Sequence, residues 1–196
     1  MPNMPPLEAQ SLTEFEPLFD AMHQRMGFIP NSLKTLARKP RLLELFVEFA
    51  LETSRDDTVD MQLKYLLGLV ASTVSGCRYC QAHLSETASR ESVDPEKIAQ
   101  VWLFESSDLF SDAERTALRF ARDAASQPNA VTADHFSDLY AHFSEEQVVE
   151  LLAIICLFRW LNCWNDTMAT ELEAKPAETA RGILAGQGWD VGKHKA

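Results

Sequence analysis

The chain has 196 residues, of which 46% are hydrophobic, and its formal net charge at pH 7 is −11. This length and apolar content suffice for one folded domain with a buried core and exclude a largely disordered chain. The negative charge argues against nucleic acids and anionic membranes as partners, because proteins bind both through Lys and Arg.

The N-terminal third is predicted to be helical. No basic stretch followed by an apolar one occurs at its start, so we expect no signal peptide and a cytoplasmic protein. Helices are predicted over 7–25 and 31–38, and a third begins at Pro40, since proline fits the first turn of a helix. Four apolar side chains of the third helix share one face, which we expect to be buried. They are Leu42, Leu45, Phe46 and Phe49.

The middle of the chain carries the strongest helical pattern. An apolar helix is predicted over 59–75 and ends at Gly76. The next helix is predicted over 77–89. An Asp-Pro pair at 94–95 opens another helix that reaches about residue 104.

Two capping boxes, at Ser111 and Ser144, open the long helices of the C-terminal half. The first runs to about residue 125, and the second, over 148–170, is the most apolar. A shorter helix begins near Thr132, between the two. The longest continuous apolar run, at 151–158, is too short to span a bilayer.

These elements predict an all-α bundle of about eight helices. A weak last helix is expected over 178–185, after which the tail should fray. No Gly- or Ser-rich linker divides the chain, so residues 1–196 are predicted to form one domain. In it, residues 1–56 form an N-terminal helical extension of a core at 57–173.

Residues 76–83, with the sequence GCRYCQAH, carry the clearest chemical signal. Residues three apart on a helix lie on one face, so Cys77 and Cys80 are expected to meet, with His83 one turn further on. A helix N-terminus favours the thiolate form of cysteine, Arg78 adds positive charge, and an imidazole can carry protons. The motif therefore predicts a redox-active dithiol.

A zinc site and a pair of inert core thiols are the alternatives. Zinc requires further ligands, and no second Cys or His pair at ligand spacing occurs, although His135, His142 or Cys163 could supply one. We favour the redox interpretation over both, and we expect neither a metal nor another cofactor.

The late apolar helix raises a second question. Cys156 and Cys163 are too far apart along it for a disulfide, and we expect both to be buried. The aromatic stripe that includes Trp164 is expected in the core or at a subunit interface. Three polar residues either end this helix or line a pocket. They are Asn162, Asn165 and Asp166.

The apolar helix at 63–72 followed by the motif at 76–83 resembles the carboxymuconolactone decarboxylase and AhpD-like alkylhydroperoxidase family, in its peroxidase-related branch. The run at 159–166 is similar to a late-helix motif of some members. The resemblance implies an AhpD-like fold, a homo-oligomer (dimer, trimer or hexamer), and reduction of hydrogen peroxide or organic hydroperoxides. It also implies a partner dithiol protein as electron donor.

Site roles follow from the same resemblance. It implies Cys80 as the peroxidatic thiol, Cys77 as the resolving thiol and His83 as the proton relay. Members of the family also place a glutamate twelve residues before the first cysteine, where this chain has Tyr65. A phenol cannot replace that carboxylate as a base at neutral pH, so we expect Glu86, one turn after His83, to orient the imidazole.

Three functions are therefore in competition. The first is a peroxidase-like or disulfide-exchange oxidoreductase. The second is a lactone decarboxylase, which the family name suggests although those members generally lack the cysteine pair. The third is a non-enzymatic oligomeric redox sensor, which the tyrosine at position 65 favours.

Overall fold

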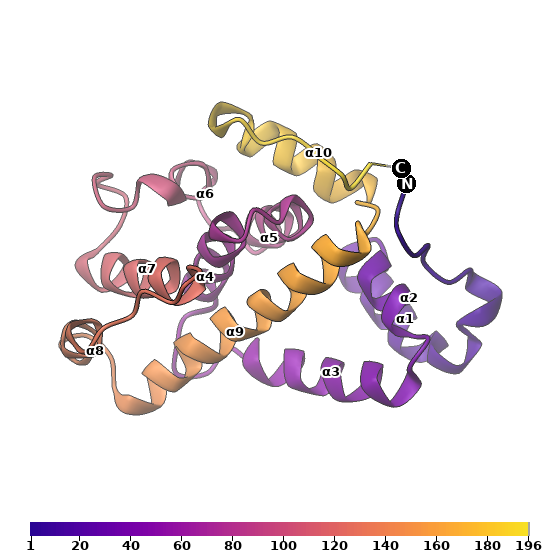
Figure 1. The fold of residues 1–196 in the computed structure, drawn as a ribbon, viewed down its shortest axis with the longest axis horizontal. Helices are drawn as coiled ribbons and strands as arrows, with labels where there is room; N and C mark the ends of the chain where they lie inside the picture. Colours follow the sequence, from indigo (N-terminus) through magenta and orange to yellow (C-terminus); the bar gives the residue numbers. More distant parts are fainter. Residues whose placement is uncertain (196) are drawn as a thin grey trace.

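The computed structural model describes residues 1–195, and in that range it contains ten α-helices, four short 3₁₀ turns and no strand (Figure 1). The predicted all-α bundle is thus confirmed. The helices are α1 (Glu16–Met26), α2 (Asn31–Leu36), α3 (Pro40–Thr53), α4 (Met61–Val74), α5 (Arg78–Arg90), α6 (Pro95–Ala99), α7 (Asp112–Ala125), α8 (Ala133–Tyr140), α9 (Glu145–Met168) and α10 (Ala174–Ile183). The 3₁₀ turns are η1 (Ala9–Ser11), η2 (Thr13–Phe15), η3 (Val101–Leu103) and η4 (Ala185–Gln187).

Helix α4 lies at the centre of the bundle and packs against α5, α7 and α9. It starts at Asp60, whose side chain accepts a hydrogen bond from the backbone N–H of Gln62. Every residue over 63–72 is buried, including Lys64, whose ammonium group pairs with Glu150 of α9. Helix α9 crosses the molecule diagonally and begins at the capping box of Ser144 (Figure 1).

The crossing of α4 and α9 is close because α4 carries a glycine there. A Cβ atom on Gly68 would lie 2.6 Å from the Phe158 ring, which is closer than two carbon atoms can pack. Gly68 thus allows the two helices that frame the site to approach each other.

The N-terminal segment has its own hydrophobic cluster, which spans residues 12–47 and meets α9 at Trp164. The prediction of one helix over 7–25 is wrong at its start, since residues 9–15 form two 3₁₀ turns. Pro17 lies in the first turn of α1, where its missing N–H costs nothing, and it sets the beginning of the helix there.

The prediction of which face of α3 is buried is wrong. Leu43 and Val47 are the buried residues, whereas Leu42, Leu45 and Phe49 are 44–47% exposed. The helix has apolar residues on two sides, so periodicity alone could not show which side faces the core. Phe46 lies between the two faces and stacks on Trp160 of α9, with ring centroids 4.6 Å apart.

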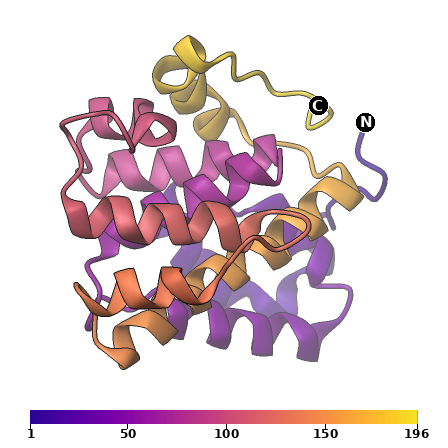
Figure 2. The same cartoon turned by 60° about the vertical axis from the view of Figure 1, so that its left-hand side comes forward.

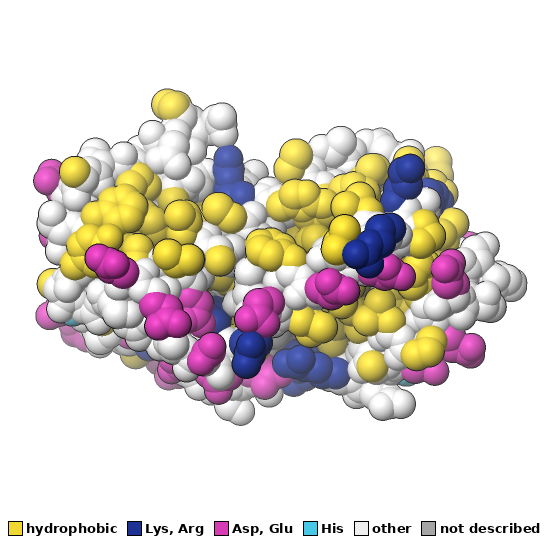
Figure 3. Space-filling model, turned by 90° about the horizontal axis from the view of Figure 1, so that it is seen from below, with side chains coloured by type: hydrophobic (Ala, Val, Ile, Leu, Met, Phe, Trp, Pro, Cys, Tyr) yellow, Lys and Arg dark blue, Asp and Glu magenta, His cyan; other side chains and the backbone are white. Residues whose placement is uncertain are grey.

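Helix α9 also leaves apolar side chains uncovered, and with α3 it forms a broad hydrophobic face (Figure 3). By length and composition alone, the 24 residues of α9 could cross a membrane. The predicted apolar run at 151–158 covers only part of α9 and so underestimates the apolar length of this helix. One third of its most apolar window is buried in the bundle. Cys156 and Cys163, predicted to be buried, are exposed on this helix.

The C-terminal segment differs most from the prediction. Helix α10 starts at Ala174, earlier than expected, and the residues after η4 do not fray. They run back toward the end of α9, so that the two chain ends lie side by side in both views (Figures 1 and 2). His194 in this tail is only 1% exposed. We refer to residues 188–195 as the C-terminal tail.

Candidate active site

Cys77 and Cys80 lie at the start of α5, as the sequence predicted. Gly76 has φ of +72°, a left-handed conformation that suits glycine, and it turns the chain from α4 into α5. Cys77 is the N-cap residue and Cys80 lies in the first helical turn. Both thiols are free and buried. At this position the backbone N–H groups and the helix dipole favour a negative charge on sulfur.

The two sulfurs differ in their surroundings. A hydrogen bond to Cys80, reinforced by burial, raises the pKa of Cys77 far above that of a free thiol, although contact with His194 acts in the opposite direction. Cys80 accepts a hydrogen bond from Nδ2 of Asn165, 3.5 Å away on α9. Asn165 thus places a hydrogen-bond donor at the Cys80 sulfur, whereas Cys77 keeps its proton.

His83 forms an ion pair with a residue that the sequence did not reveal. Its Nε2 lies 2.6 Å from Oε2 of Glu173, the N-cap residue of α10. The other carboxylate oxygen of Glu173 accepts from the Tyr79 hydroxyl at 3.0 Å. The Tyr79 ring stacks on His83 with centroids 4.3 Å apart. Glu173 therefore fixes the orientation of the imidazole through two neighbouring contacts.

Burial acts on the Glu173 carboxylate and on the Tyr79 hydroxyl that binds it. It would raise the pKa of Glu173, but the charge and hydrogen bond of His83 and the backbone N–H of Asn31 outweigh it, so the pKa lies below its ordinary value. Burial and the Glu173 charge hold the pKa of Tyr79 well above its ordinary value. Tyr79 therefore donates its proton to an ionised carboxylate.

The prediction that Glu86 orients the His83 imidazole is wrong. Its carboxylate binds Arg90 at 2.9 Å and Lys175 at 3.0 Å, and Glu173 occupies the position beside His83. Tyr65 opens into a separate cavity lined in part by Arg25 and Glu91. Burial, and after it the charge of Glu91, raises the pKa of Tyr65, so this phenol does not replace a base.

A second imidazole reaches the dithiol from the C-terminal tail. His194 contacts Cys77, and its Nδ1 lies 2.8 Å from the Thr170 carbonyl oxygen. Its Nε2 lies 3.2 Å from Oδ1 of Asp166. Burial lowers the pKa of His194, but the contacts with Cys77 and Thr170 and the charge of Asp166 outweigh it, and the net shift is upward.

The same group of side chains is the best metal-ligand set of the described residues. One donor atom from each of Cys77, Asp166 and His194 lies within 4.8 Å of the others. Thiolate, carboxylate and imidazole are all zinc ligands, so this set could hold a metal ion. His135, which the sequence offered as a zinc ligand, is instead paired with Asp123 at 2.9 Å.

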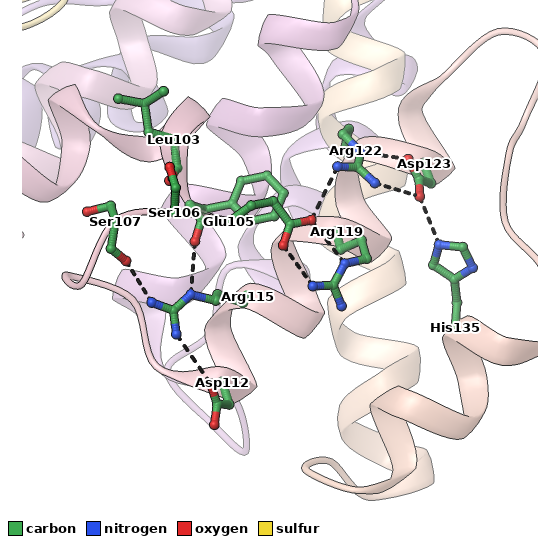
Figure 4. A network of polar contacts seen from close by, with 11 residues as sticks. Leu103, Glu105, Ser106, Ser107, Asp112, Arg115, Arg119, Arg122, Asp123 and His135 are labelled. Atoms are coloured by element: carbon green, nitrogen blue, oxygen red, sulfur yellow. Dashed lines mark hydrogen bonds and ion pairs between the residues drawn. The ribbon is translucent and has the colours of Figure 1, made fainter.

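That second His–Asp pair belongs to a polar network between α7, α8 and the loop before α7 (Figure 4). Glu105 accepts from both Arg119 and Arg122, and these hydrogen bonds lower its pKa. The network joins neighbouring elements at a partly exposed surface, and we assign it to the stability of the fold.

A cavity of about 460 Å³ lies between the end of α4 and the second half of α9, and neither Cys77 nor Cys80 is among its lining residues. Asn162 and Asp166 line it, which supports the pocket alternative for the polar residues of α9. Asn162 also donates to the Ser75 hydroxyl at 3.1 Å. Trp164 packs on the N-terminal cluster instead, stacked on Trp160. Asp166 thus connects this cavity to His194.

Comparison with known proteins places this site in context. The sequence pattern of the carboxymuconolactone decarboxylase family matches residues 40–123. The uncharacterized protein YnjA of Escherichia coli (strain K12) is 30% identical over 150 residues, which are 75% of this chain and 82% of that protein.

Solved structures extend the likeness to almost the whole chain. The debrominase Bmp8 is 33% identical with a TM-score of 0.85, over 92% of this chain and 97% of that one. A cysteine-to-alanine variant of Bmp8, in complex with 2,3,4-tribromopyrrole, is 32% identical with a TM-score of 0.85, over 92% and 96% of the two chains. An uncharacterized peroxidase-related protein with an AhpD core, from Ralstonia eutropha JMP134, shares the fold at 20% identity, with a TM-score of 0.80 over 89% and 94% of the chains.

Proposed function

Because this chain belongs to the carboxymuconolactone decarboxylase family, we propose that it is a thiol-dependent oxidoreductase that reduces its substrate through Cys77 and Cys80. The observation that carries the proposal is the pair of free, hydrogen-bonded thiols at the start of α5, next to the His83–Glu173 pair. Family members differ in activity, so the substrate has to be argued from the site.

Reduction of a hydroperoxide is the first candidate reaction. The Cys80 thiolate attacks the O–O bond, which gives a sulfenic acid on Cys80 and an alkoxide that takes a proton from His83. Cys77 then attacks the Cys80 sulfur, the S–O bond breaks, and water leaves. The products are one alcohol, one water and one disulfide, and an external dithiol protein restores the two thiols.

Reductive dehalogenation of a small aromatic ring is the second candidate, and the likeness to the debrominase Bmp8 favours it. Here the thiolate of Cys80 attacks bromine, and the ring carbon takes a proton in its place. Cys77 then displaces bromide and closes the disulfide. One C–Br bond becomes C–H at the expense of two thiols, so the electron count is that of the peroxide reaction.

Both reactions are tested on reduced protein under anaerobic conditions. One equivalent of tert-butyl hydroperoxide or a brominated pyrrole should lower the protein mass by two hydrogen atoms, and the pyrrole should release one bromide per disulfide. Cys80→Ser should abolish the reaction, whereas Cys156→Ser, on the exposed side of α9, should react like the wild type.

Three results would contradict the proposal. A Cys80→Ser variant that retains turnover would show that the thiols are not the reductant, and activity on a lactone substrate in the double Cys→Ser variant would favour a decarboxylase. Stoichiometric oxidation of the dithiol without catalytic turnover would favour the non-enzymatic sensor.

We also propose that the protein is a homo-oligomer that works in the reducing cytoplasm. The support is the apolar face on α3 and α9, where Leu45, Phe49 and Val149 are each at least 45% exposed. Large apolar faces on a small helical protein are typical of subunit interfaces. A reducing compartment would keep the two thiols in the form that attacks substrate.

A further inference from the structure

Three side chains from three different elements converge at the C-terminal tail. Cys77 is the N-cap residue of α5, Asp166 belongs to the last turn of α9, and His194 lies in the tail. One donor atom of each lies within 4.8 Å of the donor atoms of the other two. Cys77 and His194 are buried, whereas the Asp166 side chain is 28% exposed. A thiol, a carboxylate and an imidazole thus meet at one point.

The tail is held in this place by contacts other than those among the three side chains. The Leu172 N–H donates to the His194 carbonyl at 3.0 Å, and the His194 N–H donates to the Val191 carbonyl at 3.1 Å. Trp189 is buried in the main core. The three donor atoms are therefore brought together before any ion binds, which lowers the entropic cost of binding one.

The separations of the donor atoms fit a tetrahedral metal ion. Nε2 of His194 lies 3.2 Å from Oδ1 of Asp166. Two ligand atoms that each lie about 2.0–2.1 Å from zinc at a tetrahedral angle are roughly 3.3 Å apart, and a nitrogen and a sulfur are roughly 3.6 Å apart. The Cys77 sulfur, within 4.8 Å of the other two atoms, needs a shift on the order of 1 Å at most to complete this arrangement.

The neighbouring groups orient the imidazole and the carboxylate for a metal. Nδ1 of His194 lies 2.8 Å from the Thr170 carbonyl oxygen, which only accepts, so in the neutral ring Nδ1 carries the proton and Nε2 presents its lone pair. Histidines that bind metals commonly donate their other N–H in this way. Oδ2 of Asp166 binds the Lys193 ammonium at 3.3 Å. A cation at the meeting point satisfies all three donor atoms, whereas a second ring proton satisfies only one partner of Nε2.

Charge and access favour a divalent ion. A thiolate and a carboxylate together carry two negative charges, which one Zn²⁺ neutralises, and zinc takes sulfur, nitrogen and oxygen ligands together. Calcium and magnesium bind through oxygen instead. Asp166 also lines the cavity of about 460 Å³ between α4 and α9, which gives an ion from the solvent a route to the two buried ligands.

We infer that Cys77, Asp166 and His194 form a binding site for one zinc ion. The ion displaces the Cys77 proton, because a thiol that coordinates a metal is deprotonated. It joins α5, α9 and the tail through their side chains and leaves its fourth position to water. Zinc binding goes beyond the proposed function, since it requires the reduced chain and no substrate.

One consequence does rest on the proposed function. The sulfur that binds zinc is the sulfur that closes the disulfide with Cys80, and it cannot do both at once. Zinc binding and disulfide formation therefore exclude each other, and zinc holds the dithiol in its reduced form.

The test uses the reduced, metal-free, full-length protein with zinc chloride as the only added ligand. Equilibrium dialysis should give one zinc per chain. His194→Gln should bind zinc about a hundredfold more weakly or worse, and Asp166→Asn, a change of similar shape at a partly exposed position, about tenfold more weakly or worse. Circular dichroism checks that each variant is folded.

Cobalt(II) identifies the sulfur that binds the metal. It takes the same ligands as zinc, and its bond to a thiolate absorbs in the near ultraviolet. We expect this band in the wild type and in Cys80→Ser, and we expect Cys77→Ser to lack it. A band that Cys80→Ser abolishes would move the metal to the cysteine pair and overturn the assignment.

Two matched controls remove a similar side chain elsewhere. His135, which pairs with Asp123 at 2.9 Å, and Cys156, which is exposed on α9, should both be replaceable by Gln and Ser without loss of zinc. A wild-type chain that binds no zinc, or a folded His194→Gln that binds it equally well, would overturn the inference. Several weakly held ions per chain would do the same, because they would show adventitious binding to an acidic surface only.

The oxidised protein separates the zinc site from the proposed function. A disulfide sulfur has no negative charge to offer a metal, so the disulfide form should bind zinc at least about tenfold more weakly than the reduced form. Equal binding by the two forms would overturn the ligand role of Cys77. A chain that binds one zinc but forms no disulfide with a hydroperoxide or a bromopyrrole would reject the proposed function alone.

Discussion

Asn165 on α9 donates a hydrogen bond from Nδ2 to Sγ of Cys80, 3.5 Å away on α5. Its Oδ1 has no hydrogen-bond partner among residues 1–195, so the amide is held at the site mainly by its contact with sulfur. A buried polar group with half of its hydrogen bonds unmade lowers stability, and such groups are common where they serve a reaction.

Asn165→Leu should therefore slow the attack of Cys80 by about tenfold or more, the equivalent of one hydrogen bond to a charged group. Stability should change little, because the lost donor was balanced by an unsatisfied oxygen. The rate is measured as the release of the first equivalent of thiopyridone from 4,4′-dithiodipyridine, an aromatic disulfide that Cys80 attacks. Asn162→Leu is the matched control: Asn162 also has an unsatisfied Oδ1 but donates to Ser75 rather than to sulfur, so that rate should persist.

Glu173→Gln should lower the rate of hydroperoxide or bromopyrrole reduction by about tenfold to a hundredfold, because the amide neither orients His83 nor stabilises its charge as a carboxylate does. Single-turnover rates at pH 7 measure the effect. Glu86→Gln changes the same residue type on α5, away from the imidazole, and should keep the rate. An equal loss of rate in both variants would show that the effect is not specific to Glu173.

The stability of the fold should depend on pH through Glu173. Its pKa is lower in the folded state than in the unfolded chain, because His83 and the Asn31 N–H outweigh burial. Its ionised form therefore stabilises the fold above the ordinary glutamate pKa of about 4.3, and this contribution is lost as pH falls through the folded value.

We therefore expect Glu173→Gln to lower the free energy of unfolding by about 2 kcal/mol at pH 7 and by progressively less below about pH 4. Urea unfolding over that range measures it. Glu178→Gln, an exposed change on the same helix, should give no such trend. A Glu173→Gln deficit that stays constant down to pH 3 would contradict a folded-state pKa below the unfolded one.

Gly68→Ala should destabilise the protein by about 1–3 kcal/mol, because its methyl group would meet the Phe158 ring and force α4 and α9 apart. Gly182→Ala is the opposite case: no atom lies within 4 Å of its added Cβ on α10. We expect it to be neutral or stabilising by up to about 1 kcal/mol. In thermal unfolding, the melting temperature should fall for Gly68→Ala and stay the same or rise for Gly182→Ala.

Leu45→Glu on the apolar face of α3 should shift the proposed oligomer toward monomers, since a buried charge without a partner is costly at an interface. Light scattering after size exclusion measures the mass. Glu48→Gln, an exposed polar change on the same helix, should leave the mass unaltered. A wild-type protein that is monomeric at all concentrations would reject the interface.

The parts of this site that are local in sequence could be predicted. Gly76, Cys77, Cys80 and His83 follow one another across a helix start, and helix geometry alone places them together. The capping boxes at Ser111 and Ser144 likewise begin α7 and α9 as expected. Such signals depend only on residues a few positions apart, so they do not depend on how the helices pack.

The parts that depend on packing could not be predicted. Glu173 reaches His83, and His194 reaches Cys77, only because α10 and the C-terminal tail fold back over α5, and neither residue lies in a pattern that marks it. The same holds for the exposure of Cys156 and Cys163, since a helix that is apolar on two sides does not record which side has a neighbour.

The position of Glu173 in the sequence affects how pattern searches recognise members of this family. A search pattern that demands an acid twelve positions before the first cysteine would discard this protein because Tyr65 stands there. Yet Glu173, 90 residues downstream of His83, places a carboxylate 2.6 Å from the imidazole from another helix. For this family, filters built on linear spacing will miss chains whose carboxylate reaches the histidine from a distant segment, and a search on three-dimensional atom positions would retain them.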